Sequence, residues 1–263
     1  MIISFTETTT AAETPRLNLQ PLAMDAKGTD RRLSYDELKN TPTPIGTPTW
    51  RPQAHRVLVD HLKDACDVLG VTVKGEAHLT SRNDARYFGL FEVGLPTAHK
   101  EISSVLGLRN SHDKSFKAGV CAGDAPFVCS NLCFSNEITL GRKHTAGLNT
   151  LVVSNLMFEA VARLLDARSK QDERIARLKE IGLSDRNAHD IAVKSMRNGA
   201  CAPTQLANVV EQWHDPEHAE FKPRTAWSLQ NAFSNVWRKT PHLTPHRSAA
   251  LAYTFNDCLS NVG

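Results

Sequence analysis

The sequence predicts an α+β fold, in which an antiparallel sheet of about five strands follows one helix and precedes a helical C-terminal segment. Two observations lead to this prediction. Apolar and polar residues alternate in several short runs between residues 71 and 134, which is typical of half-buried strands. After residue 150, apolar residues recur at spacings of three and four, which is typical of amphipathic helices.

Composition places the chain among soluble globular proteins. It has 263 residues, of which 41% are hydrophobic and 22% charged, and its net charge is +3. These ordinary values exclude a fibre or a wholly disordered chain. No apolar run approaches the roughly 20 residues that cross a bilayer, and the first residues lack signal-peptide features, so we expect a cytoplasmic protein without membrane contact. The six cysteines are too sparse for a disulfide scaffold.

Residues 1–50 are expected to form a flexible N-terminal arm. Repeated Thr-Pro pairs at residues 41–48 favour extended chain, because each proline disfavours helical conformation in the residue before it. A short helix is predicted from Ser34 to Lys39, since Ser34 can cap it together with Glu37 three residues later.

Residues 51–148 are predicted to form the sheet unit. An amphipathic helix begins near Pro52 and ends at Gly70. Strands are then predicted at residues 71–79, 85–93, 103–110, 115–121 and 127–134. Residues 81–84 should form a turn, and residues 94–96 and 122–124 should break strands. Short connections make neighbouring strands antiparallel.

Residues 149–263 predict helices only. An apolar stripe at residues 156–181 indicates a long first helix, and Ser184 is a suitable N-cap for the second, which the pair Asn198 and Gly199 ends. Further helices are predicted at residues 203–213, 225–239 and 245–256. This segment either covers the sheet or forms a second lobe.

Residues that could take part in catalysis or binding are concentrated between Arg109 and Thr145. The run from Asn110 to Asp113 predicts a polar hairpin turn, because short polar side chains hydrogen-bond nearby backbone groups. The alternative is a polar cluster at a sheet edge, in which His112 and Asp113 share a proton.

Cys129, Asn131 and Cys133 alternate along a predicted strand and therefore share one face. Cys129 is a candidate thiol nucleophile that His144 would activate. The full set of candidate catalytic residues is His112, Asp113, Cys129 and His144. A zinc site built from these groups lacks the usual C-x-x-C spacing, so we expect no metal and no other cofactor. Buried, inert thiols are the simpler interpretation of the cysteines.

A basic loop is predicted between the sheet and the long helix. With neighbouring cations it forms a candidate nucleic-acid surface, whose members are Arg109, Lys114, Lys117, Arg142, Lys143 and His144. Solvated surface charge is the alternative, because Glu101, Asp113, Asp124 and Glu137 dilute the positive patch.

The runs RNSHDKSFKAGV, FVCSNLCF and GRKHT, in this order, resemble the signature of an uncharacterised phage and plasmid protein family, domain of unknown function 932. The later run TAWSLQNAF resembles the helix that closes that family's domain, and the similarity spans residues 50–239. The matching positions are Asn110, Ser111, Asp113, Cys129, Asn131, Arg142, His144 and Asn231. The resemblance implies a mobile-element context and no particular mechanism.

Three classes of function follow from these observations. The favoured class is a mobile-element protein that binds or anneals single-stranded DNA in recombination or counter-defence. In outline, a sheet with a basic rim is similar to the single-strand annealing recombinases, which oligomerise, so a homo-oligomer is one expectation by analogy. The second class is a hydrolase or nuclease that depends on cysteine and histidine. The third is a module that binds a host protein through the helical segment.

Overall fold

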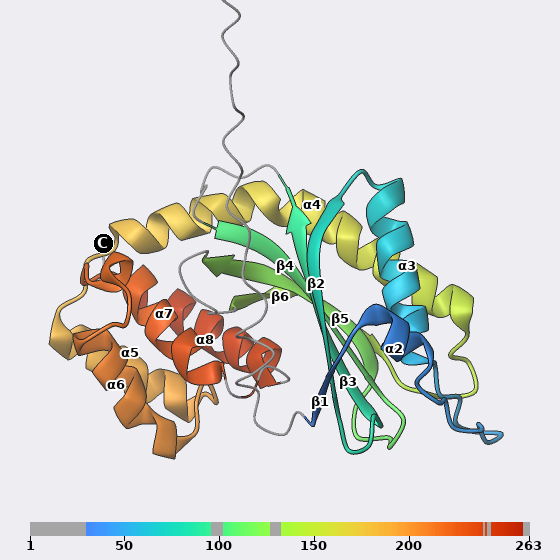
Figure 1. Ribbon diagram of the computed structural model, residues 1–263. Helices are drawn as coiled ribbons and strands as arrows, with labels where there is room; N and C mark the ends of the chain where they lie inside the picture. Colours follow the sequence, from blue (N-terminus) through green and yellow to red (C-terminus); the bar gives the residue numbers. More distant parts are fainter. Residues whose placement is uncertain (1–29, 96–101, 127–132, 239, 241–242, 260–263) are drawn as a thin grey trace, which may run out of the picture.

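The computed structural model describes residues 30–95, 102–126, 133–238, 240 and 243–259. The fold is α+β, with a six-stranded antiparallel sheet and a helical C-terminal segment (Figure 1). The predicted fold class is therefore confirmed.

Each strand of the sheet pairs with the next one in the chain, so the strand order is β1-β2-β3-β4-β5-β6. The bounds are β1 Arg31–Leu33, β2 Thr72–Ser81, β3 Arg86–Gly94, β4 Ile102–Ser111, β5 Ala118–Pro126 and β6 Cys133–Arg142. The turn predicted at residues 81–84 is confirmed. Three of its residues, Arg82, Asn83 and Asp84, have positive φ angles of 55°, 52° and 63°.

The helices are α2 Tyr35–Lys39, α3 His55–Val68, α4 Thr150–Glu180, α5 Asp185–Arg197, α6 Leu206–His214, α7 Ala226–Trp237 and α8 Thr244–Leu259. The predicted start of α5 and the predicted ends of α3 and α5 are confirmed, whereas α3 begins at His55 rather than near Pro52. Ser184 caps α5 by accepting a hydrogen bond from the Asn187 backbone N–H. Gly70 and Gly199 follow α3 and α5 with φ angles of 70° and 93°, which glycine adopts without a steric penalty.

The structure corrects the expectation of a flexible arm for residues 30–40, whereas the side chains of residues 42–49 are exposed. β1 pairs with β2, and Leu33 and Leu38 are only 4% and 1% exposed. The predicted capping box between Ser34 and Glu37 is present at the start of α2. This segment is ordered because it buries apolar side chains against the sheet unit. Residues 1–29 lie outside the described residues.

The second half of the sheet also differs from the prediction. Residues 122–124, expected to break a strand, lie inside β5, where the pairing register shifts between Cys121 and Gly123. Between these two pairs β6 advances five residues while β5 advances two, so the irregularity lies in β6, and β5 continues because it pairs regularly with β4. The last strand is β6, which contains residues 133 and 134 of the strand predicted at 127–134 and continues to Arg142; residues 127–132 of that prediction lie outside the described part of the chain.

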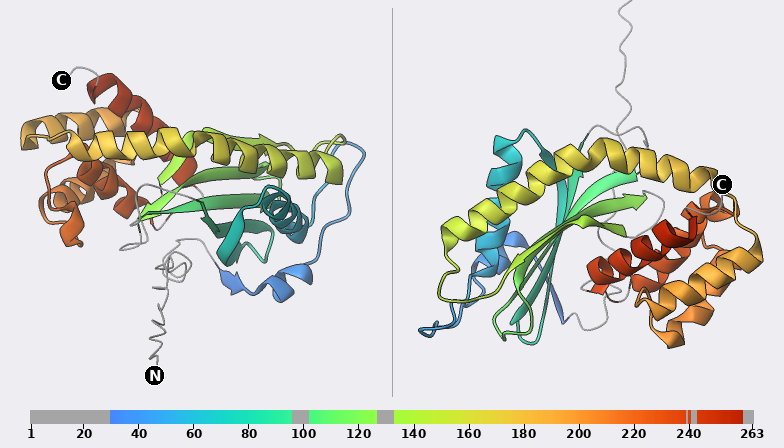
Figure 2. Two further views of the ribbon diagram at one scale, coloured as in Figure 1. Left: turned by 90° about the horizontal axis from the view of Figure 1, so that it is seen from above. Right: turned by 180° about the vertical axis from the view of Figure 1, so that it is seen from behind.

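Helices α3 and α4 cover one face of the sheet (Figures 1 and 2). The shared core contains Leu58 and Leu62 of α3, Phe91 and Leu106 of the sheet, and Met157 of α4, all fully buried. Removal of these apolar side chains from water is the main favourable term that holds the layers together. This packing fixes the start of α3 next to the end of β4.

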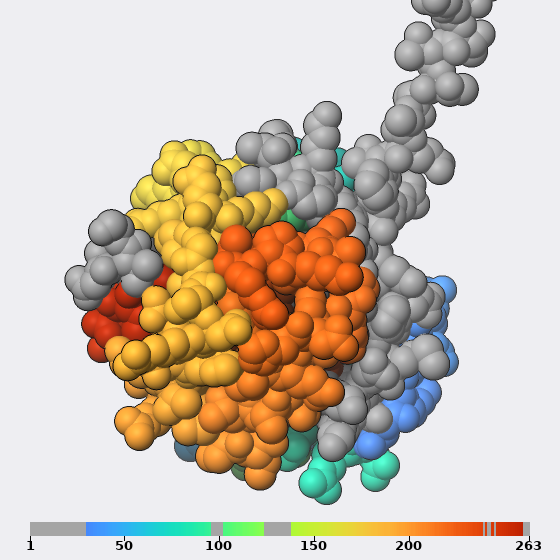
Figure 3. All heavy atoms as spheres, turned by 90° about the vertical axis from the view of Figure 1, so that its left-hand side faces the viewer, coloured from blue at the N-terminus to red at the C-terminus, as the bar shows by residue number. Residues whose placement is uncertain are grey.

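The rest of α4 runs past the sheet and joins α5, α6, α7 and α8 in a helical lobe (Figure 2). Its own core contains Trp213, Phe233, Trp237 and Phe255. Figure 3 shows this lobe from its outer side, and α8 also contacts β6. The C-terminal segment therefore does both: the first part of α4 covers the sheet, and the remaining helices form a lobe beside it. Within the described ranges, no helix combines the length and apolar character needed to span a bilayer.

Candidate nucleic-acid interface

A groove of about 510 Å³ lies at one end of the sheet, where the β4–β5 hairpin, the β6–α4 loop and the segment before α3 meet. It is lined by Trp50, Arg109, Lys114, Ser115, Phe116, Lys117, Lys143, His144 and Thr145. We call it the basic groove, and its groove cations are Arg109, Lys114, Lys117 and Lys143. Residues from three separate parts of the chain therefore form one surface.

The polar turn predicted at residues 110–113 lies at residues 112–117 instead, because Asn110 and Ser111 pair with β3 as the end of β4, and this turn shapes one wall of the groove. The Ser111 hydroxyl donates to the Phe116 carbonyl over 2.8 Å and accepts from the Phe116 N–H over 3.1 Å. Asp113 Oδ1 accepts from the Ser115 N–H at 3.0 Å, and Lys114 between them has a φ angle of 63°. Such side-chain contacts to nearby backbone stabilise tight turns. The turn thereby holds Lys114 and Phe116 at the groove.

The groove cations keep their positive charge available. In the part of the chain that the structure describes, none of them forms an ion pair with a carboxylate, and no acidic residue lines the groove. The nearby Asp113 carboxylate pairs instead with Arg86, at 2.6 Å. Partial burial would raise the Asp113 pKa, but hydrogen bonds from Ser115 and Arg86 outweigh it and hold that pKa below its ordinary value.

Two aromatic rings stand beside these cations. Lys114 Nζ lies 5.0 Å from the Trp50 ring centroid, and the Arg109 guanidinium carbon lies 6.0 Å from the Phe116 centroid. Both distances are within the range of cation–π attraction. Both rings are also partly exposed. The groove therefore presents flat apolar surfaces next to positive charge, the combination on which a nucleobase stacks while its phosphate is bound.

A network of buried histidines lies behind the groove. His55, His112 and His144 are 1%, 8% and 6% exposed. Asn110, fully buried, connects two of them, because its Nδ2 lies 2.9 Å from His55 Nδ1 and its Oδ1 lies 2.7 Å from His144 Nε2. An amide oxygen only accepts hydrogen bonds, so His144 carries its proton on Nε2.

Hydrogen bonds also fix which ring nitrogen carries the proton in His55 and His112. His55 Nε2 donates to the Asp84 carbonyl at 2.8 Å, which leaves Nδ1 to accept from Asn110. His112 Nε2 donates to the Gln53 carbonyl at 2.9 Å, and its ring stacks on His55 with centroids 4.0 Å apart. Burial, reinforced by the neighbouring His112, lowers the His55 pKa to about 3. Burial also lowers the pKa of the other two histidines, so the network is neutral near pH 7.

This network positions the segment that carries Trp50. The Gln53 carbonyl accepts a second hydrogen bond, from Asn110 Nδ2 at 2.7 Å. The Arg51 N–H donates to the His144 carbonyl at 3.1 Å, and Trp50 forms a β-bridge with Thr145. These contacts hold residues 50–53 against the end of β4 and the β6–α4 loop, which places Trp50 in the groove.

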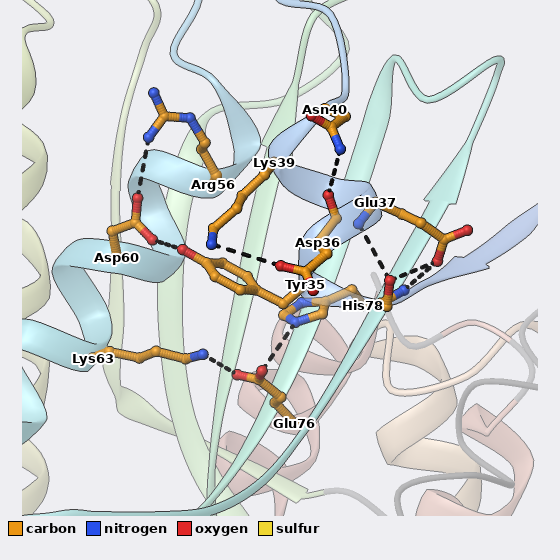
Figure 4. A network of polar contacts seen from close by, with 11 residues as sticks. Tyr35, Asp36, Glu37, Lys39, Asn40, Arg56, Asp60, Lys63, Glu76 and His78 are labelled. Carbon is orange, nitrogen blue, oxygen red and sulfur yellow. Dashed lines mark hydrogen bonds and ion pairs between the residues drawn. The ribbon is translucent and has the colours of Figure 1, made fainter.

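A second polar network anchors α2 and α3 to β2 (Figure 4). The Tyr35 hydroxyl donates to Asp60 of α3, and Lys63 pairs with Glu76 of β2 at 2.7 Å. Glu76 Oε1 lies 3.6 Å from Nε2 of the buried His78. Burial and the Asp60 carboxylate raise the Tyr35 pKa to about 12, so its hydroxyl stays protonated. These contacts fix α3, whose first residue is His55.

The structure brings most of the predicted basic set together. Arg109, Lys114, Lys117, Lys143 and His144 line the groove. Arg142 does not belong to the lining; it ends β6 with an exposed side chain.

The positions that resemble the family signature separate into two places. His144 lines the groove, and Asn110, Ser111 and Asp113 lie beside it at the end of β4 and in the following turn, whereas Asn231 is buried in α7 of the helical lobe. Asn231 Nδ2 donates to the Trp227 carbonyl of the same helix. Cys129 and Asn131 lie outside the described residues.

The candidate catalytic side chains have separate partners. His112 Nε2 faces the Gln53 carbonyl, the Asp113 carboxylate faces Arg86, and His144 Nε2 faces Asn110. Within the described ranges, no three or more histidine, cysteine and acidic side chains group to hold a metal ion. Burial raises the thiol pKa of Cys66 to about 11 and that of Cys121 to about 12, which makes both weak nucleophiles at neutral pH.

Sequence reasoning missed Trp50, Gln53 and His55. Trp50 follows a run of threonine and proline, and a lone aromatic residue beside a proline-rich segment was a usable signal. His55 has the helical spacing of the apolar face of α3, a pattern that predicts a core position and does not single out a site residue. Gln53 acts through its backbone carbonyl, which no sequence pattern reveals.

A second basic pocket, of about 420 Å³, lies in the helical lobe between α4 and α8. Its lining is Lys170, Glu173, Arg174, Arg177, Leu178, Ile181, Phe255, Asn256 and Leu259. Arg174 Nη2 donates to Gln230 Oε1 at 3.1 Å. We call it the lobe pocket.

Searches with this chain found no match among protein-family models, curated proteins or solved structures.

Proposed function

We propose that this protein binds single-stranded nucleic acid, with single-stranded DNA favoured, through the basic groove. One observation carries the proposal. The groove is lined by four cations and two partly exposed aromatic rings. Within the described residues, these cations have no carboxylate partner and no acidic side chain lines the groove.

The chemistry of a single strand fits this lining. Its phosphates attract lysine and arginine, and its unpaired bases offer flat faces for stacking on aromatic rings. A duplex hides those base faces inside its own stack. The pairing of cations with Trp50 and Phe116 therefore favours single strands over duplex.

From the family resemblance we also propose that the protein is encoded by a phage, plasmid or genomic island and acts in the cytoplasm. Strand annealing or protection during recombination or counter-defence would use such binding. One groove holds little of a strand, so we extend the proposal to a homo-oligomer, in which several grooves bind one strand with greater avidity.

We propose only this binding function and not a hydrolase or nuclease activity. His112, Asp113 and His144 each engage a partner that positions backbone or turn, as their contacts to Gln53, Arg86 and Asn110 indicate.

The test is the salt dependence of binding to a labelled thymidine oligonucleotide, measured by fluorescence anisotropy. Contacts with one or two phosphates in the groove predict a slope of about −1 for log K against log salt, because each neutralised phosphate of a single strand contributes about −0.7, and Lys114→Ala or Lys143→Ala should each weaken binding and bring the slope closer to zero. Lys170→Ala in the lobe pocket is the matched control and should leave the slope unchanged. Absence of binding at low salt would overturn the proposal.

A further inference from the structure

The basic groove holds more positive charge than one internal nucleotide neutralises. Its volume of about 510 Å³ lies within the roughly 300–1,000 Å³ typical of pockets for one small molecule. It therefore accommodates about one nucleotide unit at a time. An internal phosphodiester brings a single negative charge, whereas four cations line the groove.

A terminal phosphate corrects this mismatch. A phosphomonoester carries a charge of about −1.5 to −2 near neutral pH and three strong acceptor oxygens, and a polyphosphate carries more. Arg109 offers a planar fork that binds two phosphate oxygens at once, and the three lysines add mobile ammonium groups. The hydroxyls of Ser115 and Thr145 supply neutral donors in the same lining.

One side of the groove has a continuous wall. Trp50 forms β-bridges with both Thr47 and Thr145, and the Arg51 N–H donates to the His144 carbonyl. The segment before α3 is thereby joined to the β6–α4 loop by backbone hydrogen bonds. This wall bounds the groove on one side and holds Trp50 beside the groove cations.

We infer that the basic groove binds the terminal phosphate of a nucleotide, with the adjoining base against Trp50 or Phe116, in preference to an internal phosphodiester. The inference rests on the proposed function, since it names the part of the ligand that the groove selects. A strand end and a free nucleotide share this chemistry.

The experiment compares single strands of about 12 nucleotides with one sequence and different ends, at one salt concentration. The ends are 5′-triphosphate, 5′-phosphate, 3′-phosphate and hydroxyl. We expect the best phosphorylated end to bind about 10- to 100-fold tighter than the hydroxyl end, the effect of one charge-assisted hydrogen bond or two. Lys143→Ala should reduce this preference, and Lys170→Ala in the lobe pocket should leave it intact.

Competition then identifies the source of the phosphate. A free nucleoside triphosphate that displaces the strand at the strand's own dissociation constant supports the inference and assigns a free nucleotide. Displacement only at much higher concentration supports it and assigns a strand end. Equal affinity for all four ends overturns the inference but leaves the proposed function standing. Failure of every oligonucleotide and nucleotide to bind overturns both.

Discussion

The two basic pockets of this protein have similar volumes, about 510 Å³ for the basic groove and about 420 Å³ for the lobe pocket. Each is lined by at least three lysine or arginine side chains. They differ in what accompanies the charge. Glu173 lies among the cations of the lobe pocket, where Arg174 is hydrogen-bonded to Gln230. Its aromatic residue, Phe255, is buried in the core.

The comparison shows that a count of basic residues is a poor guide to a ligand site. A polyanion gains most from cations that lack carboxylate neighbours, because it need not displace an existing partner. It gains further from exposed rings beside them. Only the basic groove has both features within the described residues, and the predictions below test that difference.

Charge reversal should give the largest effect. Lys114→Glu combined with Lys143→Glu brings the charge of the groove lining close to zero and should weaken single-strand binding about 1,000-fold at 0.1 M salt. Anisotropy titration measures the loss. Lys170→Glu combined with Arg177→Glu in the lobe pocket makes the same change of charge and should weaken single-strand binding less than about 2-fold. Comparable losses in both variants would remove the distinction between the pockets.

Two buried asparagines compare the stability of the two regions. Asn110→Ala leaves buried polar atoms of His55 and His144 without their partner, and should lower the free energy of unfolding by about 3 kcal/mol. Asn231→Ala removes the contacts of this side chain, including the hydrogen bond to the Trp227 carbonyl of the same helix, and should cost less, about 1 to 2 kcal/mol. Urea denaturation measures both values. A smaller loss for Asn110 than for Asn231 would show that the histidine network contributes little.

The histidine network should also make stability depend on pH. The folded His55 pKa is depressed to about 3, so below its ordinary value of about 6.5 the unfolded chain takes up a proton that the folded protein does not. The contribution of the neutral His55 to the free energy of unfolding is therefore fully present above about pH 6.5 and decreases towards pH 3. At pH 5, His55 alone should lower the free energy of unfolding by about 2 kcal/mol.

Denaturation at pH 7 and pH 5 measures this effect. His55→Asn should flatten the dependence, while His189→Asn, at a partly exposed site in the lobe, serves as the control. Stability that rises as the pH falls from 7 to 5 would contradict the neutral network.

Loss of the aromatic ring should give the smallest effect. Trp50→Ala removes one stacking surface and should weaken single-strand binding about 10-fold, while Trp50→Phe should retain most of the affinity. Anisotropy at fixed salt measures both variants. An alanine variant with unchanged affinity and unchanged thermal stability would place the bases away from Trp50.

The sequence by itself determined the fold class and most of the regular elements. Helices such as α3 and α5 follow from apolar spacing and from caps within a few residues, such as Ser184 and Gly199. The stretch from residue 109 to 145 also contained the groove cations. The helices can be predicted from the sequence because periodicity and capping depend on neighbours along the chain.

Only the tertiary structure decided which distant residues meet. β1 pairs with β2 across about 45 residues, and regular pairing with β4 keeps residues 122–124 in β5. Trp50 reaches the groove because Gln53 and Arg51 hydrogen-bond to residues far along the chain, at Asn110 and His144. Such contacts depend on strand register and on the burial of both partners, which the local pattern of a sequence does not encode.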